Sequence, residues 1–453
     1  MDLSVRLAMA AKRITPPGCP SLAATAEAVR SKRQSALEVM EACLTRIRQS
    51  EDTVQAWHTL DPELAKRTAR ELDERGATGS LAGIPIGLKD VIDTKDMPTE
   101  NGTIVDRGRR PSEDAALVAR LRNAGALFPG KTVSTELAFF SPGKTRNPHD
   151  PERTPGGSSS GSAAAVAAGM VAAAIGGQTV GSVIRPASFN GTWGMKPSYG
   201  AIPVTGVSPL APSHDHMGVF AQNPLDLALV IDVISGDDGR DPAARGASPT
   251  ALADALQSPL ERPRLAFMRT AAWADFDARL QKPFEELADS LGAHEVVMPE
   301  KFEAAWGLHL TIQIAEMAKS FARIDDRSKL SQVLRQALED GEAVTAEQYE
   351  AAKAGAEELR EAFGELMAGY DAAITPSARG EAPRGLERTG DPVLCLLWTL
   401  LRVPAVSVPA MTGPDGLPVG VQIVAPRGHD TTALRAAAWV GRRLGVGGEA
   451  EPA

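Results

Sequence analysis

A lysine and two groups of serines in this chain have the chemistry and the setting of catalytic residues. Lys89 ends the apolar run GIPIGLK, and the serines lie in the glycine-rich segments 156–161 and 176–182. A serine hydroxyl is a poor nucleophile until a base removes its proton, and a neutral lysine can act as that base when burial lowers its pKa. These residue types therefore favour acyl transfer by a serine with a lysine base.

Residues 157–161, GSSSG, also match GxSxG, the nucleophile elbow of α/β-hydrolases, with Ser159 at its centre. That hypothesis needs an Asp and a His farther along the chain, for which the candidates are Asp215-His216 and His429-Asp430. The preceding segment TRNPHDPERTP is not typical of a strand, and five letters in a Gly/Ser-rich loop match by chance. The elbow is therefore the weaker hypothesis.

A longer pattern is far more specific. Residues 145–169, TRNPHDPERTPGGSSSGSAAAVAAG, followed by 176–200, GGQTVGSVIRPASFNGTWGMKPSYG, strongly resemble the amidase signature family, with GIPIGLKD upstream. The resemblance continues through LRNAGALFPGKTVSTELAF, SHDHMGVFAQ and the C-terminal PAVSVPAMTGPDGLPVGVQIVAP. It covers nearly the whole chain and thins between about 235 and 370.

The resemblance implies a role for each candidate. The family's catalytic lysine falls on Lys89, and its bridging serine, which follows a cis peptide bond, falls on Ser158. The family's nucleophile falls on Ser182, which lies 24 residues after Ser158, the interval that the family shows. In this arrangement Ser158 passes the proton of Ser182 to Lys89.

The turn at 176–181 is expected to form an oxyanion hole. Its glycines let consecutive backbone N–H groups point at one spot, where they would stabilise the oxyanion of a tetrahedral intermediate. The amides that we nominate are those of Thr179, Val180, Gly181 and Ser182.

The same turn departs from the commoner form of the family. Where many members have an Asp followed by Thr-Gly-Gly-Ser-Ile-Arg, this chain begins with Gln178, has Val180 in place of a glycine, and places Arg185 one position later. These changes leave the three catalytic candidates intact but affect the expected shape of the oxyanion loop and the acid-side pocket. They also weigh against the amidotransferase subunit that uses this fold.

The substrate pocket and the histidines give weaker signals. As lining residues we nominate Phe139, Phe140, Trp306, His309 and Trp398. His214 and His216 flank Asp215, but a tight turn cannot easily aim all three side chains at one ion, so no metal site is expected.

Composition excludes several other classes of protein. The chain has 453 residues, 43% hydrophobic and 23% charged, with a formal net charge of -9, which argues against nucleic acid or an anionic membrane as the main partner. Cys19, Cys43 and Cys395 show neither disulfide nor zinc spacing. Residues 154–184 lack charge but are rich in Ala, Gly and Ser, so we interpret them as protein core rather than a membrane span. No signal peptide is evident at the N-terminus, and we expect a cytoplasmic location.

The succession of elements predicts an α/β fold. We expect helices within 21–75, a strand at 84–88 that delivers Lys89, a helix at 116–125, a strand at 126–133 and a small-residue helix at 162–177. Farther on we expect a helix at 345–367, a hairpin of strands 403–410 and 417–426, and a final helix at 431–444.

These elements predict one domain over 1–453, a large mixed twisted sheet flanked by helices, as the resemblance implies. Its parts are a helical entry at 1–75, the signature core at 76–230, a variable helix-rich substrate side at 235–380, and C-terminal strands with a closing helix at 381–453.

The predicted function is hydrolysis of amide-type C–N bonds in a small molecule through a serine acyl-enzyme, without a cofactor. Cleavage of a carbamate or an ester by the same residues is the alternative. An amidotransferase A-type subunit is a third hypothesis, which the changed turn makes less favoured. A homodimer is left open.

Overall fold

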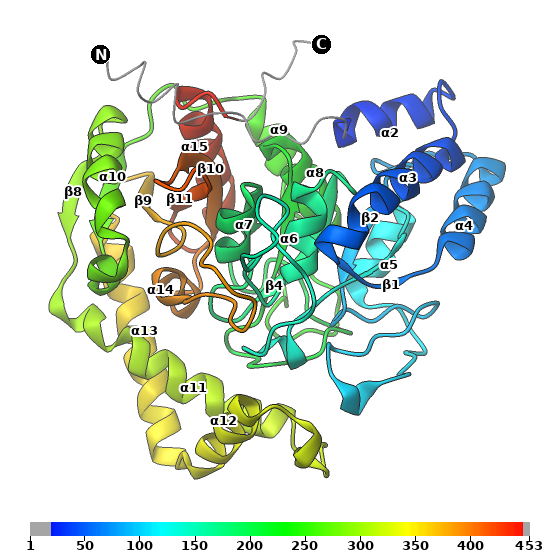
Figure 1. Ribbon diagram of the computed structural model, residues 1–453. Coiled ribbons are helices and arrows are strands. Elements are labelled where there is room, and N and C mark those ends of the chain that lie inside the picture. Colours follow the sequence, from blue (N-terminus) through cyan, green and yellow to red (C-terminus); the bar gives the residue numbers. More distant parts are fainter. Residues whose placement is uncertain (1–19, 447–453) are drawn as a thin grey trace.

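Eleven strands form one continuous mixed sheet in the computed structural model, which describes residues 20–446 (Figure 1). The order across the sheet is β1-β3-β2-β4-β6-β5-β10-β11-β9-β7-β8. The strands are β1 (Trp57–Leu60), β2 (Ile86–Lys89), β3 (Gly130–Thr132), β4 (Ala173–Gln178), β5 (Trp193–Lys196), β6 (His216–Ala221), β7 (Leu265–Arg269), β8 (His294–Val297), β9 (Ala372–Pro376), β10 (Ala405–Thr412) and β11 (Pro418–Val424).

The sheet has parallel pairs near both ends and antiparallel pairs in its middle. Strand β2 runs parallel to β3 and β4, and β7 runs parallel to β8 and β9. The pairs from β4 through β6, β5, β10 and β11 to β9 are antiparallel, as is β1 with β3. The expected α/β fold with a large mixed sheet is therefore confirmed, as is the hairpin of β10 and β11.

Helices cover both faces of this sheet (Figure 1). The α-helices are α2 (Leu22–Arg30), α3 (Ala36–Val54), α4 (Pro62–Arg75), α5 (Ala116–Asn123), α6 (Ser160–Ala167), α7 (Ile184–Asn190), α8 (Pro224–Ile234), α9 (Leu252–Leu256), α10 (Ala278–Ser290), α11 (Ala305–Ser320), α12 (Gln332–Ala343), α13 (Ala346–Leu366), α14 (Val393–Leu400) and α15 (Asp430–Arg443). Short 3-10 helices are η1 (Ile104–Asp106), η2 (Glu136–Ala138), η3 (Ala271–Asp275), η4 (Glu300–Ala304) and η5 (Arg327–Lys329).

Alternation along the strands separates the two faces. Ala173 and Ile175 of β4 join a hydrophobic cluster with α2, α5, α8, α9, α10 and α15, whereas Ala174 joins a second cluster with α3, α4 and α6. A third cluster covers the far strands with α11, α13 and α14. Helices α11, α12 and α13 extend away from the sheet at the bottom of Figure 1. We call the face that carries α6 the second face.

The N-terminal helices begin where local capping predicts. Ser35 accepts a hydrogen bond from the amide of Glu38, whose carboxylate accepts one from the amide of Ser35, so α3 starts with a capping box. Asp61 accepts from the amide of Leu64 at the start of α4. Ser21 precedes α2, but its side chain makes no capping bond.

The predicted small-residue helix at 162–177 is wrong in its second half. Helix α6 ends at Ala167, since Gly169 has a positive φ of 70° and turns the chain into strand β4. Small residues serve close packing here, because a Cβ on Gly176 would lie 2.7 Å from the hydroxyl of Ser159. Ala and Gly are thus required by contact with the neighbouring layer, which helical periodicity does not reveal.

The uncharged stretch 154–184 is built into this core as a loop, the short helix α6 and strand β4. Within residues 20–446, no helix combines the length and the apolar character needed to cross a bilayer.

Candidate active site

Strand β2 delivers Lys89 to the second face of the sheet. Ile86 and Leu88 belong to the first hydrophobic cluster, so the alternate position, Lys89, points to the side where α6 and the Gly/Ser loop lie. Its side chain is buried, and its Nζ donates a hydrogen bond of 2.6 Å to Ser158 Oγ. The strand expected to deliver Lys89 is therefore present, and it brings two of the predicted residues together.

Burial makes Lys89 a candidate base near neutral pH. Desolvation lowers the pKa of Lys89 from 10.5 to about 7, while the carboxylate of Asp215 acts in the opposite direction. The neighbouring Asp90 lies on the other side of the strand, where it accepts hydrogen bonds from the amides of Glu100 and Gly102. Asp90 therefore does not pair with Lys89.

Ser158 follows a cis peptide bond from Gly157. A Cβ on Gly157 would lie 2.7 Å from the methyl carbon of Thr389, so the close packing of this turn requires glycine. The carbonyl oxygen of Gly157 accepts a hydrogen bond of 2.6 Å from Arg185 Nη2. The peptide that precedes Ser158 is thus held by a buried arginine from the start of α7.

Ser182 lies in the loop between β4 and α7 and is almost entirely buried, with 8% of its surface exposed. The loop packs closely, because a Cβ on Gly181 would lie 2.9 Å from side-chain carbons of Cys395 and Pro392. Within residues 20–446, no protein acceptor receives a hydrogen bond from the amides of Thr179, Val180, Gly181 or Ser182. These N–H groups are therefore available to a ligand.

The side chain of Gln178 holds the loop that contains Ser182. Its side-chain oxygen accepts hydrogen bonds of 2.8 and 3.0 Å from the amides of Val183 and Ile184, and its Nε2 donates to Thr399 Oγ1 at 3.0 Å. The hydroxyl of Thr399 donates in turn to the carbonyl of Val180 at 2.7 Å. The amide side chain thus fixes both ends of the segment that contains Ser182.

Two neighbouring cavities meet at this loop. Ser182 lines a narrow one of about 10 Å³, whereas Lys89 and Ser158 line a larger one of about 130 Å³. Ala138, Thr179 and Leu210 line both. A molecule bound at Ser182 would therefore lie next to the space into which Lys89 and Ser158 face.

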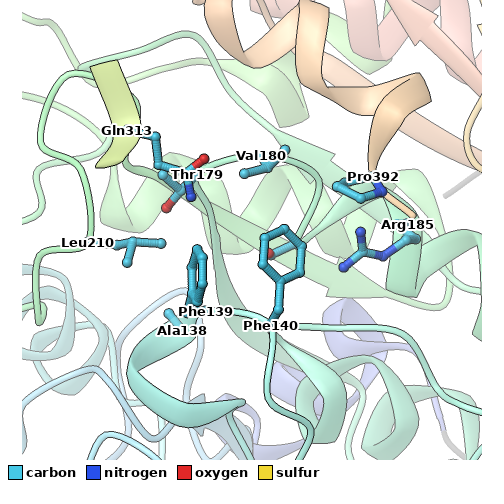
Figure 2. A pocket seen from close by; sticks show the side chains of 10 residues that line it. Ala138, Phe139, Phe140, Thr179, Val180, Arg185, Leu210, Gln313 and Pro392 are labelled. Carbon is cyan, nitrogen blue, oxygen red and sulfur yellow. The ribbon is translucent and has the colours of Figure 1, made fainter. Parts of the chain in front are cut away.

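Only some of the aromatic residues nominated for the pocket line a cavity of the site. Phe139 and Phe140 line the cavity of Ser182, where their rings lie edge to face (Figure 2). Trp306 is exposed on α11, His309 is buried against the ring of His214, and Trp398 is buried against Phe363. None of these three residues lines either of the two cavities of the described chain. His309 and Trp398 are packed into the core, which suits an aromatic ring as well as a pocket does, and Trp306 lies on the surface.

The strained turn before the phenylalanines aims them at the site. Leu137 and Ala138 have positive φ values of 47° and 60°, a conformation that costs about 1–2 kcal/mol per non-glycine residue. The amide of Leu137 donates to the carbonyl of Asn101, and Thr135 Oγ1 donates to the carbonyl of Phe139, which hold the turn in place.

The serine of the alternative elbow is occupied elsewhere. Ser159 is fully buried, and its hydroxyl donates to the carbonyl of Gly177 and accepts from the amide of the same residue. Ser159 therefore ties α6 to β4 and lines neither of the two cavities.

The histidines and cysteines lie in structural positions. Asp215 accepts hydrogen bonds from Thr179 Oγ1 and from the amides of Leu210 and Ala211. His214 is buried, and burial holds its pKa well below the usual range. Among residues 20–446 there is no group of three or more ligand side chains arranged to hold a metal ion. Cys43 and Cys395 are buried, and their thiols donate to the carbonyls of Met170 and Ser377, whereas Cys19 lies outside the described residues.

Sequence reasoning missed one polar group of the pocket. Gln313 of α11 lines the cavity of Ser182, is buried, and its Nε2 has no hydrogen-bond partner. It lies in the variable segment, where no motif marks it. Periodicity along α11 could have placed it on a buried face, but only the tertiary structure brings that face to the nucleophile loop.

Comparison with known proteins assigns the family. The sequence profile of the amidase family matches residues 38–434. The chain belongs to the amidase family. The predicted resemblance is thereby confirmed, and the profile includes Lys89, Ser158 and Ser182.

Individual relatives of this family member carry different activities in their names. The A-type subunit of glutamyl-tRNA(Gln) amidotransferase from Symbiobacterium thermophilum is 34% identical over 92% of this chain and 95% of its own length. The solved peptide amidase of Stenotrophomonas maltophilia is 27% identical, with a TM-score of 0.82 over 96% of this chain and 98% of that one. A structure from a vestigial protein complex connected with the origins of an s-triazine catabolic enzyme is 27% identical, with a TM-score of 0.88 over 94% and 99%.

The role of Gln178 can be tested by unfolding. In Gln178→Ala the buried amides of Val183 and Ile184 lose their acceptor, so we expect the free energy of unfolding to fall by about 2–6 kcal/mol, at about 1–3 kcal/mol for each of the two unsatisfied groups. Gln222→Ala is the control, because that half-buried glutamine donates one hydrogen bond, to the carbonyl of Val166, and holds no amide. Equal losses in urea titrations of the two variants would contradict the assigned role.

Replacement of the buried lysine should stabilise the fold. In Lys89→Met the cost of burying an amine is removed, a gain of up to a few kcal/mol at 1.36 kcal/mol per pKa unit. Because the folded pKa of Lys89 is about 7 and the ordinary value is 10.5, both states bind the proton below pH 7 and the wild type bears the full cost there. The advantage of the variant should therefore be largest below pH 7 and shrink as pH rises toward 10.5. Urea unfolding at several pH values measures it, and an advantage that grows with pH would contradict the lowered pKa.

Proposed function

We propose that the chain hydrolyses amide-type C–N bonds of small molecules with Ser182 as nucleophile, Ser158 as proton bridge and Lys89 as base. The observation that carries this proposal is the 2.6 Å hydrogen bond between Lys89 Nζ and Ser158 Oγ. It joins a serine hydroxyl to a lysine whose pKa burial lowers to about 7, so the amine is half neutral near neutral pH.

The reaction follows from the placement of these groups. Ser182 Oγ attacks the carbonyl carbon and transfers its proton to Ser158 Oγ, while the proton of Ser158 passes to neutral Lys89. The oxyanion is stabilised by free amides of the loop that contains Thr179 and Gly181. The leaving amine then takes a proton from Lys89 through Ser158, and water releases the acyl group by the same steps in reverse.

One contact of this relay must form in the complex with substrate. No hydrogen bond joins Ser182 Oγ to another group in residues 20–446. Catalytic hydrogen bonds are often long without substrate and tighten in the reactive complex. A substrate carbonyl that is held by the loop amides would fix Ser182 beside Ser158, since the two serines line adjoining cavities.

The same residues would also cleave a carbamate or an ester, because the acyl chemistry differs only in the group attached to the carbonyl. Competition between an amide and the matching carbamate and ester, measured as kcat/KM, decides among these bonds.

An amidotransferase component is the second candidate function, favoured by the names of the curated relatives. The solved peptide amidase is a relative of comparable coverage, and its name supports amide hydrolysis. Sustained amide hydrolysis by the isolated chain would favour the hydrolase, whereas turnover that requires a partner protein would favour the amidotransferase.

Covalent labelling tests the nucleophile. A serine-directed phosphonate should modify Ser182 with loss of activity. Of Ser158, Ser159 and Ser182, only Ser182 lines the narrow cavity, beside backbone amides that have no protein acceptor. Peptide mass spectrometry locates the label, and Ser182→Ala should abolish it. Modification of Ser159 instead would support the elbow hypothesis.

The protonation of Lys89 governs the pH dependence. Activity should rise as pH passes upward through about 7, because only the neutral amine accepts a proton. Lys89→Arg should reduce kcat about as strongly as Lys89→Ala, by about 10²–10⁴-fold, since a guanidinium does not deprotonate in this range.

The matched control is Lys131→Met. Lys131 is another buried lysine with a pKa lowered to about 8, and it donates to the carbonyl of Ile92 and the hydroxyl of Thr99. This variant should keep the rise of activity near pH 7. Loss of the rise in activity near pH 7 in Lys131→Met would contradict the role of Lys89. So would a Lys89→Arg variant that keeps most of the wild-type turnover on a lightly activated amide.

A further inference from the structure

The cavity that Lys89 and Ser158 line has a wide wall of apolar side chains, which the proposed reaction does not use. Its volume is about 130 Å³, against about 10 Å³ for the cavity of Ser182. Its apolar side chains include those of Val91, Val204, Val207, Leu210 and Met217. A cavity of about 150 Å³ with apolar walls can hold a benzene ring, so this space suits an apolar substituent of similar size.

The polar side chains of the same lining are largely bound to the protein. Lys89 donates to Ser158, and Asp215 accepts hydrogen bonds from Thr179 Oγ1 and from two backbone amides. Gln178 binds two amides of the nucleophile loop. An apolar group in this cavity would therefore break none of these hydrogen bonds, and it would lose apolar surface to water on entering.

The chemistry decides which part of a substrate lies in each cavity. After attack the acyl carbon is bonded to Ser182 Oγ, so the acyl group lies in the narrow cavity that this serine lines. The leaving nitrogen takes its proton through Ser158, so its substituent faces the wide cavity. Leu210 lines both cavities, and Figure 2 shows it on the side of the two phenyl rings away from Arg185. One molecule can therefore extend from the narrow cavity into the wide one.

We propose that the substrates are short-chain acyl amides of apolar amines, with the substituent of the leaving nitrogen in the cavity of Lys89. This inference rests on the proposed function and specifies the substrate class of the same site. The bond between the acyl carbon and nitrogen breaks, and the nitrogen takes the proton that passes through Ser158 and leaves as a primary amine. Water then supplies the hydroxyl group of the released acid and the proton that restores Ser182.

The narrow cavity limits the acyl group to a few atoms. Phe139 and Phe140 leave space of only about 10 Å³ beside Ser182, roughly enough for one water. An acetyl group needs little more, whereas a longer acyl chain would have to displace the phenyl rings, which follow the strained turn at Leu137 and Ala138. A substrate with a large acyl group and an unsubstituted nitrogen would place its bulk on the side with less room.

Pairs of isomers that exchange the two sides of the amide isolate this preference. N-butylacetamide and hexanamide are isomers, as are N-benzylacetamide and 3-phenylpropanamide, but only the first of each pair carries its apolar group on nitrogen. We expect kcat/KM of the unaltered chain to be about 10–100-fold higher for the first of each pair, because each methylene buried in the cavity contributes about fourfold and about two or three would be buried. Butylamine is a poorer leaving group than ammonia, so intrinsic reactivity opposes this order.

Substitutions at Val207 assign the preference to the wide cavity. Val207 is half-buried, so Val207→Phe should place a larger side chain in the cavity and lower the ratio of kcat/KM for N-butylacetamide to that for acetamide by about tenfold. Val207→Ala should instead raise the ratio of N-benzylacetamide to N-butylacetamide, since it enlarges the same space. Val233→Phe is the control: Val233 is also half-buried against the first hydrophobic cluster but lines neither cavity of the site, so both ratios should persist.

The outcomes separate the two proposals. Labelling of Ser182 and hydrolysis of amides with equal rates for the isomers, or with higher rates for hexanamide and 3-phenylpropanamide, would overturn the assigned substrate class and leave the proposed hydrolase intact. A preference for N-butylacetamide that is unchanged in Val207→Phe would overturn the role given to the wide cavity. Absence of labelling and of hydrolysis for every amide would overturn the hydrolase, and this inference with it.

Discussion

The site depends on the burial of one amine, that of Lys89, away from water and beside the hydroxyl of Ser158. Three lysines of the described chain are buried with a strongly lowered pKa, namely Lys89, Lys131 and Lys196. Lys196 donates to the carbonyl of Val403, and Lys131 donates to the carbonyl of Ile92 and to the hydroxyl of Thr99, which itself donates to the Ile92 carbonyl. Lys89 donates to the hydroxyl of Ser158, and both of these residues line the cavity next to Ser182, so neutral Lys89 can take part in proton transfer to a bound molecule. The lowered pKa is common to the three lysines, whereas a hydroxyl partner that faces a cavity distinguishes Lys89 from the other two.

Close packing around that amine accounts for the unusual composition of the core. Positions 157, 176 and 181 have no room for a Cβ, because each would meet neighbouring side-chain atoms at less than 3.0 Å. The small residues thus let two loops and α6 approach β2 and β4 closely enough for Lys89 to meet Ser158. The glycines contribute to the site indirectly. They bury little hydrophobic surface, but they set the positions of polar groups.

The sequence was most informative where function requires particular side chains in local segments. Lys89, Ser158 and the loop of Ser182 could be placed because each lies in a short motif whose backbone is set by glycines. The helix expected at 162–177 failed because small residues suit both a tightly packed helix and a buried strand, and only Gly169 marks the boundary. Gln313 could not be found, because its place depends on how α11 packs against the loop.

Two departures from the commoner family pattern, Gln178 and the later position of Arg185, are physically linked. Gln178 reaches across the loop to bind the amides of Val183 and Ile184, which fixes the first turn of α7 and therefore the direction of Arg185. Arg185 lines the narrow cavity of Ser182, while Lys89 faces the wider cavity beyond Thr179. The carboxylate of Asp215, which lines the wider cavity, raises the pKa of Lys89, but desolvation lowers it more, so the amine can be neutral near pH 7. The loop that Gln178 holds thus keeps the guanidinium and the neutral amine on different walls of the site.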